Sequence, residues 1–208
     1  MTLFVYFFAA VAAYLIGGVN PSIIVSKTIY KKDVRELGSH NAGFTNFKRA
    51  FGGKWAWLVL IGDMLKAALT CFIIGKIFGR VLGRAQFGAA YACFFVILGH
   101  TFPIWYGFRG GKGVAVICGG YLFINWTIWL ICFPLFVLVL FLTKYMSVAV
   151  ICGSIASAVL LALSGADKGA VVMVSLCVAL IAWQHRENFR RLRLGTESKF
   201  SLHNRSQK

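Results

Sequence analysis

This chain consists largely of long apolar runs separated by short polar segments. About 20 consecutive apolar residues suffice for a helix to cross the hydrocarbon core of a bilayer. With 59% hydrophobic and 13% charged residues, the chain is too apolar for a soluble domain. We therefore expect an all-α integral membrane protein with a single membrane-embedded domain over residues 1–208. The apolar runs cover residues 3–25, 55–79, 85–106, 114–142, 146–166 and 168–184.

The first run predicts a retained transmembrane helix rather than a cleaved signal peptide. No Lys or Arg precedes it, whereas Lys27, Lys31 and Lys32 follow it. A signal peptide would carry its positive charge in front of the apolar stretch. We therefore expect the N-terminus to lie outside the cytoplasm.

The run 114–142 can be one long span or two short ones, and the positive charges discriminate between these topologies. Six spans would leave 10 positive residues inside and 11 outside, omitting Lys66 within a span. A turn near Asn125 and Trp126 gives seven spans, with 17 positive residues inside and four outside. Cytoplasmic loops carry the excess of Lys and Arg in membrane proteins. The charge distribution therefore favours a seven-transmembrane-helix bundle with the N-terminus outside and the C-terminus cytoplasmic.

The first polar segment, RELGSHNAGFTNFKRAFGGK at residues 35–54, combines small residues with hydrogen-bond donors. Glycines let backbone N–H groups approach a ligand, and hydroxyl, amide and guanidinium groups donate to phosphate oxygens. A solvated inter-helix loop is the alternative, but its length and its content of Asn and Gly favour a binding function. Its candidate residues are Ser39, Asn41, Thr45, Asn46 and Arg49.

A glycine-rich stretch, GFRGGKGVA at residues 107–115, follows the run that ends near His100 and Pro103. It is not a Walker A loop, because Tyr106 takes the place of the first Gly and Gly113 that of the Ser or Thr. Backbone amides, Lys112 and the N-terminus of the next helix remain, and together they predict a metal-free anion site. A plain basic turn is the alternative. The candidate residues are Gly110, Gly111, Lys112 and Gly113.

Further polar residues interrupt or border the apolar runs. Asp63 and Lys66 stand three apart in one run, so they share a helix face and predict a buried structural pair. His185 and Asn188 have the same spacing where the last run ends. Ser147 gains interest only if a phosphate site lies nearby. His100 stands alone, so a structural role as a packed or hydrogen-bonded histidine is as compatible with the sequence as a catalytic role.

Several classes of chemistry lack their sequence signatures. The chain contains neither a GxSxG motif nor the HxxxxD motif of the common glycerolipid acyltransferases. Only six residues are acidic, and none of the six cysteines forms a CxxC pair. We therefore expect no metal site and no cofactor. The net charge of +16 fits contact with anionic lipid and an anionic substrate.

Five polar blocks follow one another along the chain: YLIGGVNPS, DVRELGSHNAGFTNFKR, GDMLKA, GHTFPIWYGFRGGKGVA and HRENFRRLRLGTESK. In this order they resemble the blocks of the acyl-phosphate-dependent glycerol-3-phosphate acyltransferase family, PlsY. The resemblance runs from about Tyr14 to Lys199 and is specific as a set, although each block alone is weak.

The resemblance implies a seven-helix bacterial inner-membrane enzyme whose active site faces the cytoplasm. Its reaction would move the acyl group of an acyl phosphate to the 1-hydroxyl of sn-glycerol 3-phosphate. The products would be lysophosphatidic acid and phosphate, in the first step of phospholipid synthesis. The partners would be these two substrates and membrane lipids, with no nucleic acid, and we expect a monomer.

The resemblance also implies roles for individual residues. Ser39 matches the Ser of the family's GSGN block, Arg49 the Arg after its TN pair, and Lys112 the Lys of its GGKG. Ser147 matches a Ser that begins the sixth helix, and His185 and Asn188 match the HRxN block. We expect His185, Asn188, Ser39 and Ser147 as catalytic residues, with Arg49 and Lys112 binding phosphate.

The chain departs from the family pattern at three places. Gly18-Val19-Asn20-Pro21 stands where members often read GSIP, His40 replaces the middle Gly of GSGN, and Phe44 replaces the usual Ala. These departures bear on the contact from the first helix and on the first loop.

A transporter or binding protein for organic phosphates is the rival interpretation, because it too would use basic residues and broken helices. The polar residues, however, gather on one side of the membrane in the predicted topology, and the sequence shows no two-fold repeat.

Overall fold

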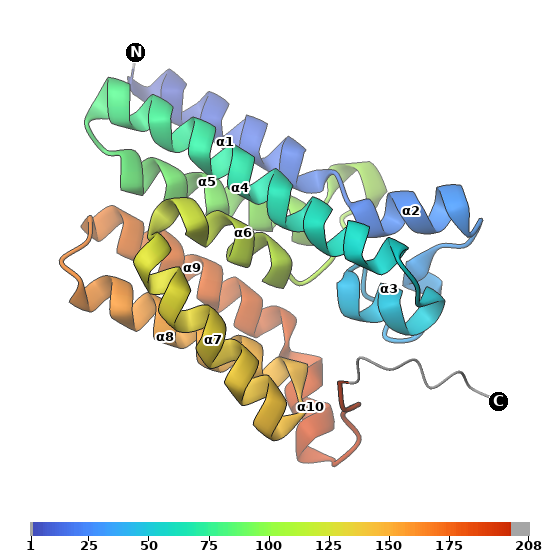
Figure 1. Ribbon diagram of the computed structural model, residues 1–208. Coiled ribbons are helices and arrows are strands. Elements are labelled where there is room, and N and C mark those ends of the chain that lie inside the picture. The colour runs from blue at the N-terminus through green and yellow to red at the C-terminus, as the bar shows by residue number, and fades with distance from the viewer. Residues whose placement is uncertain (1, 201–208) are drawn as a thin grey trace.

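The computed structural model describes residues 2–200, and all regular secondary structure in that range is helical. Arg205 and Lys208, two of the tail cations counted above, lie outside the described residues. Figure 1 shows the long helices packed side by side along roughly one direction. They are α1 (Thr2–Gly18), α2 (Pro21–Ile29), α3 (Phe44–Phe51), α4 (Trp55–Leu82), α5 (Ala85–Thr101), α6 (Val114–Ile124), α7 (Trp126–Thr143), α8 (Met146–Leu163), α9 (Lys168–Gln184) and α10 (Arg186–Arg193), with 3₁₀ turns η1 (Val34–Glu36) and η2 (Ile104–Tyr106).

The run 114–142 is broken at Asn125, as the charge argument predicted. The Asn125 N–H donates to the Tyr121 carbonyl at 3.0 Å and ends α6. Its side-chain oxygen accepts from the Ile128 N–H at 3.0 Å and caps the start of α7. One residue thus satisfies backbone groups of both helices, and the cap of α7 requires its polar side chain. Figure 1 shows the chain reversing direction between α6 and α7.

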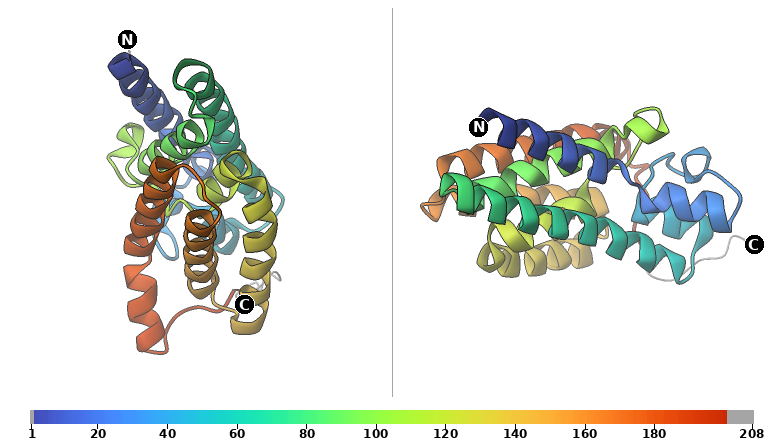
Figure 2. Two further views of the ribbon diagram at one scale, coloured as in Figure 1. Left: turned by 90° about the vertical axis from the view of Figure 1, so that its left-hand side faces the viewer. Right: turned by 90° about the horizontal axis from the view of Figure 1, so that it is seen from above.

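Hydrogen bonds define the two ends of the bundle. At one end, which Figure 1 shows near the N-terminus, Arg84 donates to both carboxylate oxygens of Asp167 at 2.9 and 2.7 Å. Gln86 donates to the Ile124 carbonyl at 3.2 Å and accepts from the Asp167 N–H at 3.1 Å. These contacts join the α4–α5 turn, the end of α6 and the α8–α9 turn. The helices α2, α3 and α10 lie at the opposite end, called the mouth end below (Figures 1 and 2).

Close helix packing requires a small residue where α6 crosses α4. A Cβ atom at Gly119 would lie 2.1 Å from the Met64 carbonyl oxygen, a distance that backbone atoms cannot accommodate. Small residues at such crossings let helix backbones approach in membrane proteins, where dispersion contacts rather than water exclusion hold helices together. The crossing places α6 in the interior, and Gly119, Gly120 and Tyr121 are buried.

Five helical stretches are long and apolar enough to cross a membrane, and a sixth qualifies if α9 and α10 count together across their 49° bend. Helix α6 has 11 residues, about 16 Å at 1.5 Å per residue, against a hydrocarbon core of about 30 Å. The chain is a multi-pass membrane protein. The seven-span count and the orientation of the termini remain predictions. The five stretches are Thr2–Ile29, Trp55–Leu82, Ala85–Tyr106, Trp126–Thr143 and Met146–Leu163.

Candidate functional site

A cavity of about 710 Å³ joins a polar mouth to an apolar arm. The mouth is formed by α3 and the segment before it, the start of α6, the start of α8, and the α9–α10 bend with α10 and the residues after it. The arm lies between α4, α6, α7 and α8. The polar residues that line the mouth include Ser39, Asn41, Thr45, Asn46, Arg49, Lys112, Ser147, His185, Asn188, Arg191, Glu197 and Ser198. The arm is lined by residues that include Leu60, Met64, Ile117, Trp129, Phe133, Phe136, Leu140 and Val150.

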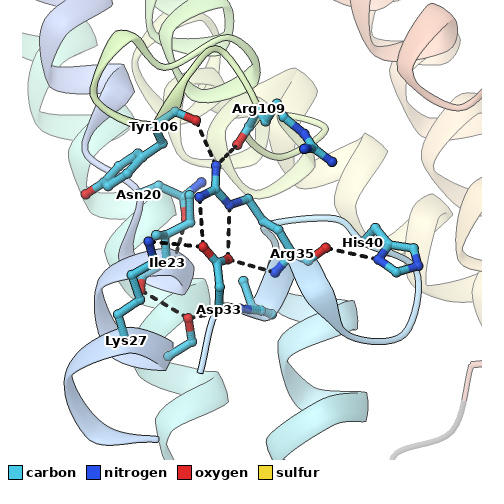
Figure 3. Close-up of polar contacts among 10 residues, drawn as sticks. Asn20, Ile23, Lys27, Asp33, Arg35, His40, Tyr106 and Arg109 are labelled. Carbon is cyan, nitrogen blue, oxygen red and sulfur yellow. Dashed lines mark hydrogen bonds and ion pairs between the residues drawn. The ribbon is translucent and has the colours of Figure 1, made fainter. Parts of the chain in front are cut away.

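Arg35 fastens the two glycine-containing segments of the mouth to each other (Figure 3). Its Nη1 donates to the Tyr106 carbonyl at 2.7 Å and to the Arg109 carbonyl at 3.2 Å. Its Nε and Nη2 donate to the two oxygens of Asp33 at 3.0 and 2.8 Å. A bidentate pair of this kind fixes the plane of the guanidinium. The sequence reasoning assigned no role to Asp33 or Arg35.

Asn20 attaches the start of α2 to the same region. Its side-chain oxygen accepts from the Ile23 N–H at 3.1 Å, and its Nδ2 donates to the Ala42 carbonyl at 3.1 Å. The side chain is completely buried. The departure from the family pattern around Asn20 therefore supplies a helix cap and a tie to the first polar segment.

His40, the second departure, lies in the left-handed region with φ = 58°. Side chains other than Gly are strained there, although His is among the residues that tolerate it. The ring compensates in part, because its Nδ1 lies 3.0 Å from the Arg35 carbonyl oxygen. The conformation explains why a glycine suits this place in the family pattern.

The amide of Asn46 is engaged within its own loop. Its Nδ2 donates to the Val34 and Leu37 carbonyls, both at 3.0 Å, and its oxygen accepts from the Ser39 N–H at 2.8 Å. Both amide hydrogens are therefore used, and the side chain has no donor left for a phosphate. In this structure Asn46 shapes the loop that carries Ser39.

Two of the predicted anion-binding amides hold the loop instead. The N–H groups of Gly110 and Gly111 donate to the Thr101 and His100 carbonyls at 3.1 and 3.0 Å. They thereby satisfy carbonyls at the end of α5. A Cβ atom at Gly111 would lie 2.2 Å from His100 Nε2, so this close approach requires glycine. Neither glycine lines the cavity, whereas Lys112, Gly113 and the start of α6 do.

Lys112 belongs to a chain of polar contacts that crosses the mouth. Its Nζ donates to Asn188 Oδ1, and Asn188 Nδ2 donates to Glu197 Oε1 at 2.6 Å. Glu197 Oε2 accepts from Arg191 Nε at 2.7 Å. Burial, followed by the nearby charge of Arg191, lowers the pKa of Lys112 from 10.5 to about 8. The protonation of Lys112 near pH 8 therefore depends on the charges next to it.

His185 lies in the bend between α9 and α10, beyond the apolar helix. Its Nδ1 is 2.8 Å from the Ile181 carbonyl oxygen. A carbonyl only accepts, so Nδ1 carries the proton and Nε2 keeps its lone pair. Burial and then the charge of Lys112 lower the pKa of His185 to about 4. A neutral imidazole that can accept a proton or a hydrogen bond therefore lines the cavity.

Ser147 begins α8 at the mouth and is 1% exposed. Among the described residues its hydroxyl has no hydrogen-bond partner. Buried polar groups are nearly always paired, and leaving one unpaired costs about 1–3 kcal/mol. An unpaired hydroxyl in the wall of a cavity is suited to binding a ligand.

Asp63 and Lys66 form the buried pair that their spacing predicted, with Nζ 2.9 Å from Oδ1. Lys66 also donates to the Gly17 and Val19 carbonyls at 2.9 and 2.7 Å, where α1 ends. The Nδ1 of His100 lies 3.1 Å from Lys66 Nζ. The pair therefore fixes the end of α1, and His100 is a buried, hydrogen-bonded histidine. Breaking such a buried pair typically costs 3–5 kcal/mol.

The cavity brings together ten of the twelve residues expected to act on substrate, and it omits Gly110 and Gly111. It adds Arg191, Glu197 and Ser198, which the sequence reasoning did not single out. The sequence did carry one signal for Glu197, because it is an acidic residue among many cations in the block HRENFRRLRLGTESK. Those brought together are Ser39, Asn41, Thr45, Asn46, Arg49, Lys112, Gly113, Ser147, His185 and Asn188.

Comparison with known protein families gives one match that covers most of the chain. The family described as Glycerol-3-phosphate acyltransferase matches residues 7–195. A glycerol-3-phosphate acyltransferase of Clostridioides difficile (strain 630) is 38% identical over 200 residues, covering 96% of this chain and 97% of that protein. One from Coxiella burnetii (strain Dugway 5J108-111) is 34% identical over 197 residues, covering 95% and 99%.

Solved structures give the same result at the level of the fold. A crystal structure of PlsY (YgiH), described as an integral membrane glycerol 3-phosphate acyltransferase in its glycerol 3-phosphate form, superposes with a TM-score of 0.87. It is 32% identical, and the match covers 94% of this chain and 96% of that one. A second crystal structure of PlsY (YgiH), with lysophosphatidic acid, has a TM-score of 0.83 and 31% identity.

Proposed function

Because the chain belongs to the glycerol-3-phosphate acyltransferase family, we propose that it transfers an acyl group from an acyl phosphate to the 1-hydroxyl of sn-glycerol 3-phosphate. The products are 1-acylglycerol 3-phosphate and inorganic phosphate. The observation that carries the proposal is one continuous cavity that joins a cationic mouth to an apolar arm. A ligand with a phosphate at one end and a hydrocarbon chain at the other matches both parts.

The phosphate ends of the substrates bind in the mouth. Lys112 and Arg49 supply positive charge, the Ser147 hydroxyl supplies a buried donor, and the N-terminus of α6 begins at Val114 beside them. Charged donors held in a partly water-excluded site stabilise the charge that develops on a leaving phosphate. The hydrocarbon chain of the donor lies in the arm between α6, α7 and α8.

The reaction needs no nucleophile from the protein. The 1-hydroxyl oxygen attacks the acyl carbon, a new C–O ester bond forms, and the bond from that carbon to the phosphate oxygen breaks. The bonding electrons leave with the phosphate, whose charge Lys112 and Arg49 neutralise. Holding both substrates in one cavity replaces a bimolecular encounter by a positioned one. The hydroxyl proton moves to a base.

Two groups can serve as that base. His185 offers the free Nε2 of a neutral ring, and the phosphate of the acceptor is the alternative. Replacing His185 by Ala separates them, with Asn188→Ala as the comparison. If His185 is the base, its loss lowers kcat by about 10²–10⁴-fold and removes the acidic limb of the pH–rate profile. A near-normal rate in His185→Ala leaves the acceptor phosphate as the base.

The mouth faces the cytoplasm of a bacterial inner membrane in this proposal. Its support is the charge distribution, because 15 of the described cations that flank the helices lie in segments at the mouth end and four lie at the other. Cytoplasmic surfaces carry such an excess. Glycerol 3-phosphate, which is charged and water-soluble, would then enter from the cytoplasm.

The deciding experiment uses the purified protein in detergent, supplied with palmitoyl phosphate and glycerol 3-phosphate. We expect lysophosphatidic acid to form without acyl-CoA or acyl carrier protein. Uptake of glycerol 3-phosphate into proteoliposomes with no acylated product would instead support a transporter and would falsify the enzyme.

A further inference from the structure

The residues after α10 return across the mouth of the cavity. The Thr196 N–H donates to the Arg191 carbonyl at 2.8 Å, and the Phe200 N–H donates to the Lys144 carbonyl at 2.7 Å, just before α8. Lys48 Nζ lies 5.8 Å from the centre of the Phe200 ring. Residues 194–200, called the C-terminal strap below, are therefore held at both ends. Glu197 lies in the middle of this strap with its side chain 8% exposed.

The contacts of Glu197 determine which way its partners face. Its carboxylate oxygens accept from Asn188 Nδ2 at 2.6 Å and from Arg191 Nε at 2.7 Å. A carboxylate only accepts hydrogen bonds, and the ammonium of Lys112 only donates. The NH₂ group of Asn188 must therefore face Glu197, and its oxygen must face Lys112. In the opposite amide orientation, the Asn188 oxygen would face the Glu197 carboxylate, so two acceptors would meet. The Asn188 NH₂ group would then face the Lys112 ammonium, so two donors would meet.

Resting on the proposed function, we propose that Glu197 is a positioning residue for acyl transfer: through Asn188 and Arg191 it orients the donors of the mouth around Lys112. One amide hydrogen of Asn188 is used by Glu197, and the second remains for a substrate oxygen. Arg191, which lines the cavity, is likewise held by its Nε, so that its remaining N–H groups can meet phosphate.

The charge of Glu197 also acts on Lys112. The charged or titratable groups around Lys112 are Arg49 from α3, Arg186 and Arg191 from α10, His185 from the bend, and Glu197 from the strap. Among these, only Glu197 is negative. It raises the pKa of Lys112, whereas burial and the three arginines lower it. Removing the charge of Glu197 therefore shifts the deprotonation of Lys112 to lower pH.

A purely structural role in fastening the C-terminal strap is the competing explanation. It predicts a less stable protein whose folded fraction keeps the wild-type kcat. The two explanations are therefore separated by the kcat of the folded enzyme, and the titration of Lys112 tests the electrostatic contact that the proposal requires.

The test compares Glu197→Gln with Glu187→Gln in the palmitoyl phosphate assay. Glu187 is a matched control, because its side chain is 58% exposed on α10, pairs with Arg190 at 3.7 Å and does not line the cavity. For Glu197→Gln we expect kcat to fall by roughly 10- to 100-fold, because misplacing the groups that position a substrate lowers the rate by about this factor. We also expect the alkaline limb of kcat/KM to move to lower pH. For Glu187→Gln we expect the wild-type kcat and the wild-type position of the alkaline limb of kcat/KM.

A second measurement does not depend on activity. The reactivity of Lys112 with acetic anhydride, followed by mass spectrometry across pH in detergent, reports its titration directly. Glu197→Gln should become reactive at lower pH than the wild type. An unchanged Lys112 titration in Glu197→Gln overturns the proposal, and so does a wild-type kcat. An inactive wild type would overturn the proposed function, while the labelling experiment would still test the contact between Glu197 and Lys112.

Discussion

At the scale of single residues, the mouth depends on which hydrogen-bonding groups the fold leaves free. Asn46, Gly110 and Gly111 use their donors to hold loops, whereas the Ser147 hydroxyl has no partner among residues 2–200. Lys112 keeps a compact charge whose other donors can turn toward a ligand. The difference between a loop-holding and a ligand-binding residue therefore lies in its hydrogen bonds.

Replacing Lys112 by Ala should reduce acyl transfer by about 10²–10³-fold, because a charged donor aimed at the leaving phosphate is lost. Arg109→Ala is the matched control. It removes a cation from the same loop, but the Arg109 side chain is exposed and does not line the cavity. The measurement is kcat/KM in detergent, with thermal unfolding as a check on the fold. Full activity of Lys112→Ala would contradict its role in phosphate binding.

The pH dependence of acyl transfer should reflect the ionisation of Lys112. The pKa of Lys112 is lowered to about 8, so the charged form that binds phosphate is present below pH 8 and is lost as the pH rises through that value. We expect kcat/KM to decline above about pH 8. The alkaline decline of kcat should lie at a higher pH than that of kcat/KM, because bound phosphate favours the charged ammonium form of Lys112. Initial rates from pH 6 to 10 test this, and a flat profile up to pH 10 would argue against it.

At the scale of elements, the short helix α6 determines the depth of the apolar arm. The residues that line the arm end at Tyr121 on α6 and at Ser157 on α8, and the Tyr121 hydroxyl donates to the Ser157 carbonyl at 2.7 Å. Ser157 is ten residues beyond Ser147, about 15 Å along α8. That is about half of a hydrocarbon core of about 30 Å. The Tyr121–Ser157 bridge therefore closes the arm at the depth of one leaflet.

Shortening Tyr121 to Ala should lengthen the arm and shift the preference toward longer acyl chains. Each further buried methylene contributes about 0.8 kcal/mol, so the preference can rise by up to about fourfold per carbon. The measurement is kcat/KM for a series from lauroyl to stearoyl phosphate. Tyr121→Phe is the control, because it removes the hydrogen bond but keeps the ring. An unchanged chain profile in Tyr121→Ala would show that the arm ends elsewhere.

At the scale of the whole molecule, polar chemistry and positive charge are concentrated at one end of the helix bundle. The far end is joined by the Arg84–Asp167 pair and the contacts of Gln86, and it carries few cations. Such an asymmetry favours one orientation in the membrane. A ligand with one end in water and the other in lipid then reaches the cavity from a single side.

The orientation can be measured with single cysteines introduced after the six native ones are replaced. Lys168→Cys lies at the far end and Arg193→Cys on α10 at the mouth end, and both positions are exposed. With a membrane-impermeant maleimide, we expect Lys168→Cys to react in spheroplasts and Arg193→Cys to react only after lysis. The reverse pattern would place the mouth outside the cytoplasm.

Sequence patterns alone predicted the membrane class, the break near Asn125, the Asp63–Lys66 pair and most of the residues that line the mouth. Each of these predictions rests on a signal that can be read along the chain: run length, charge balance, helical spacing or a set of ordered blocks. Only the folded chain shows the depth of the arm, the loop-holding roles of Asn46 and Gly110, and the position of Glu197. Those features rest on contacts between separate segments, such as Arg35 with Tyr106 and Lys112 with Asn188. Whether a donor is free for substrate depends on such distant partners, and no local pattern of residues records them.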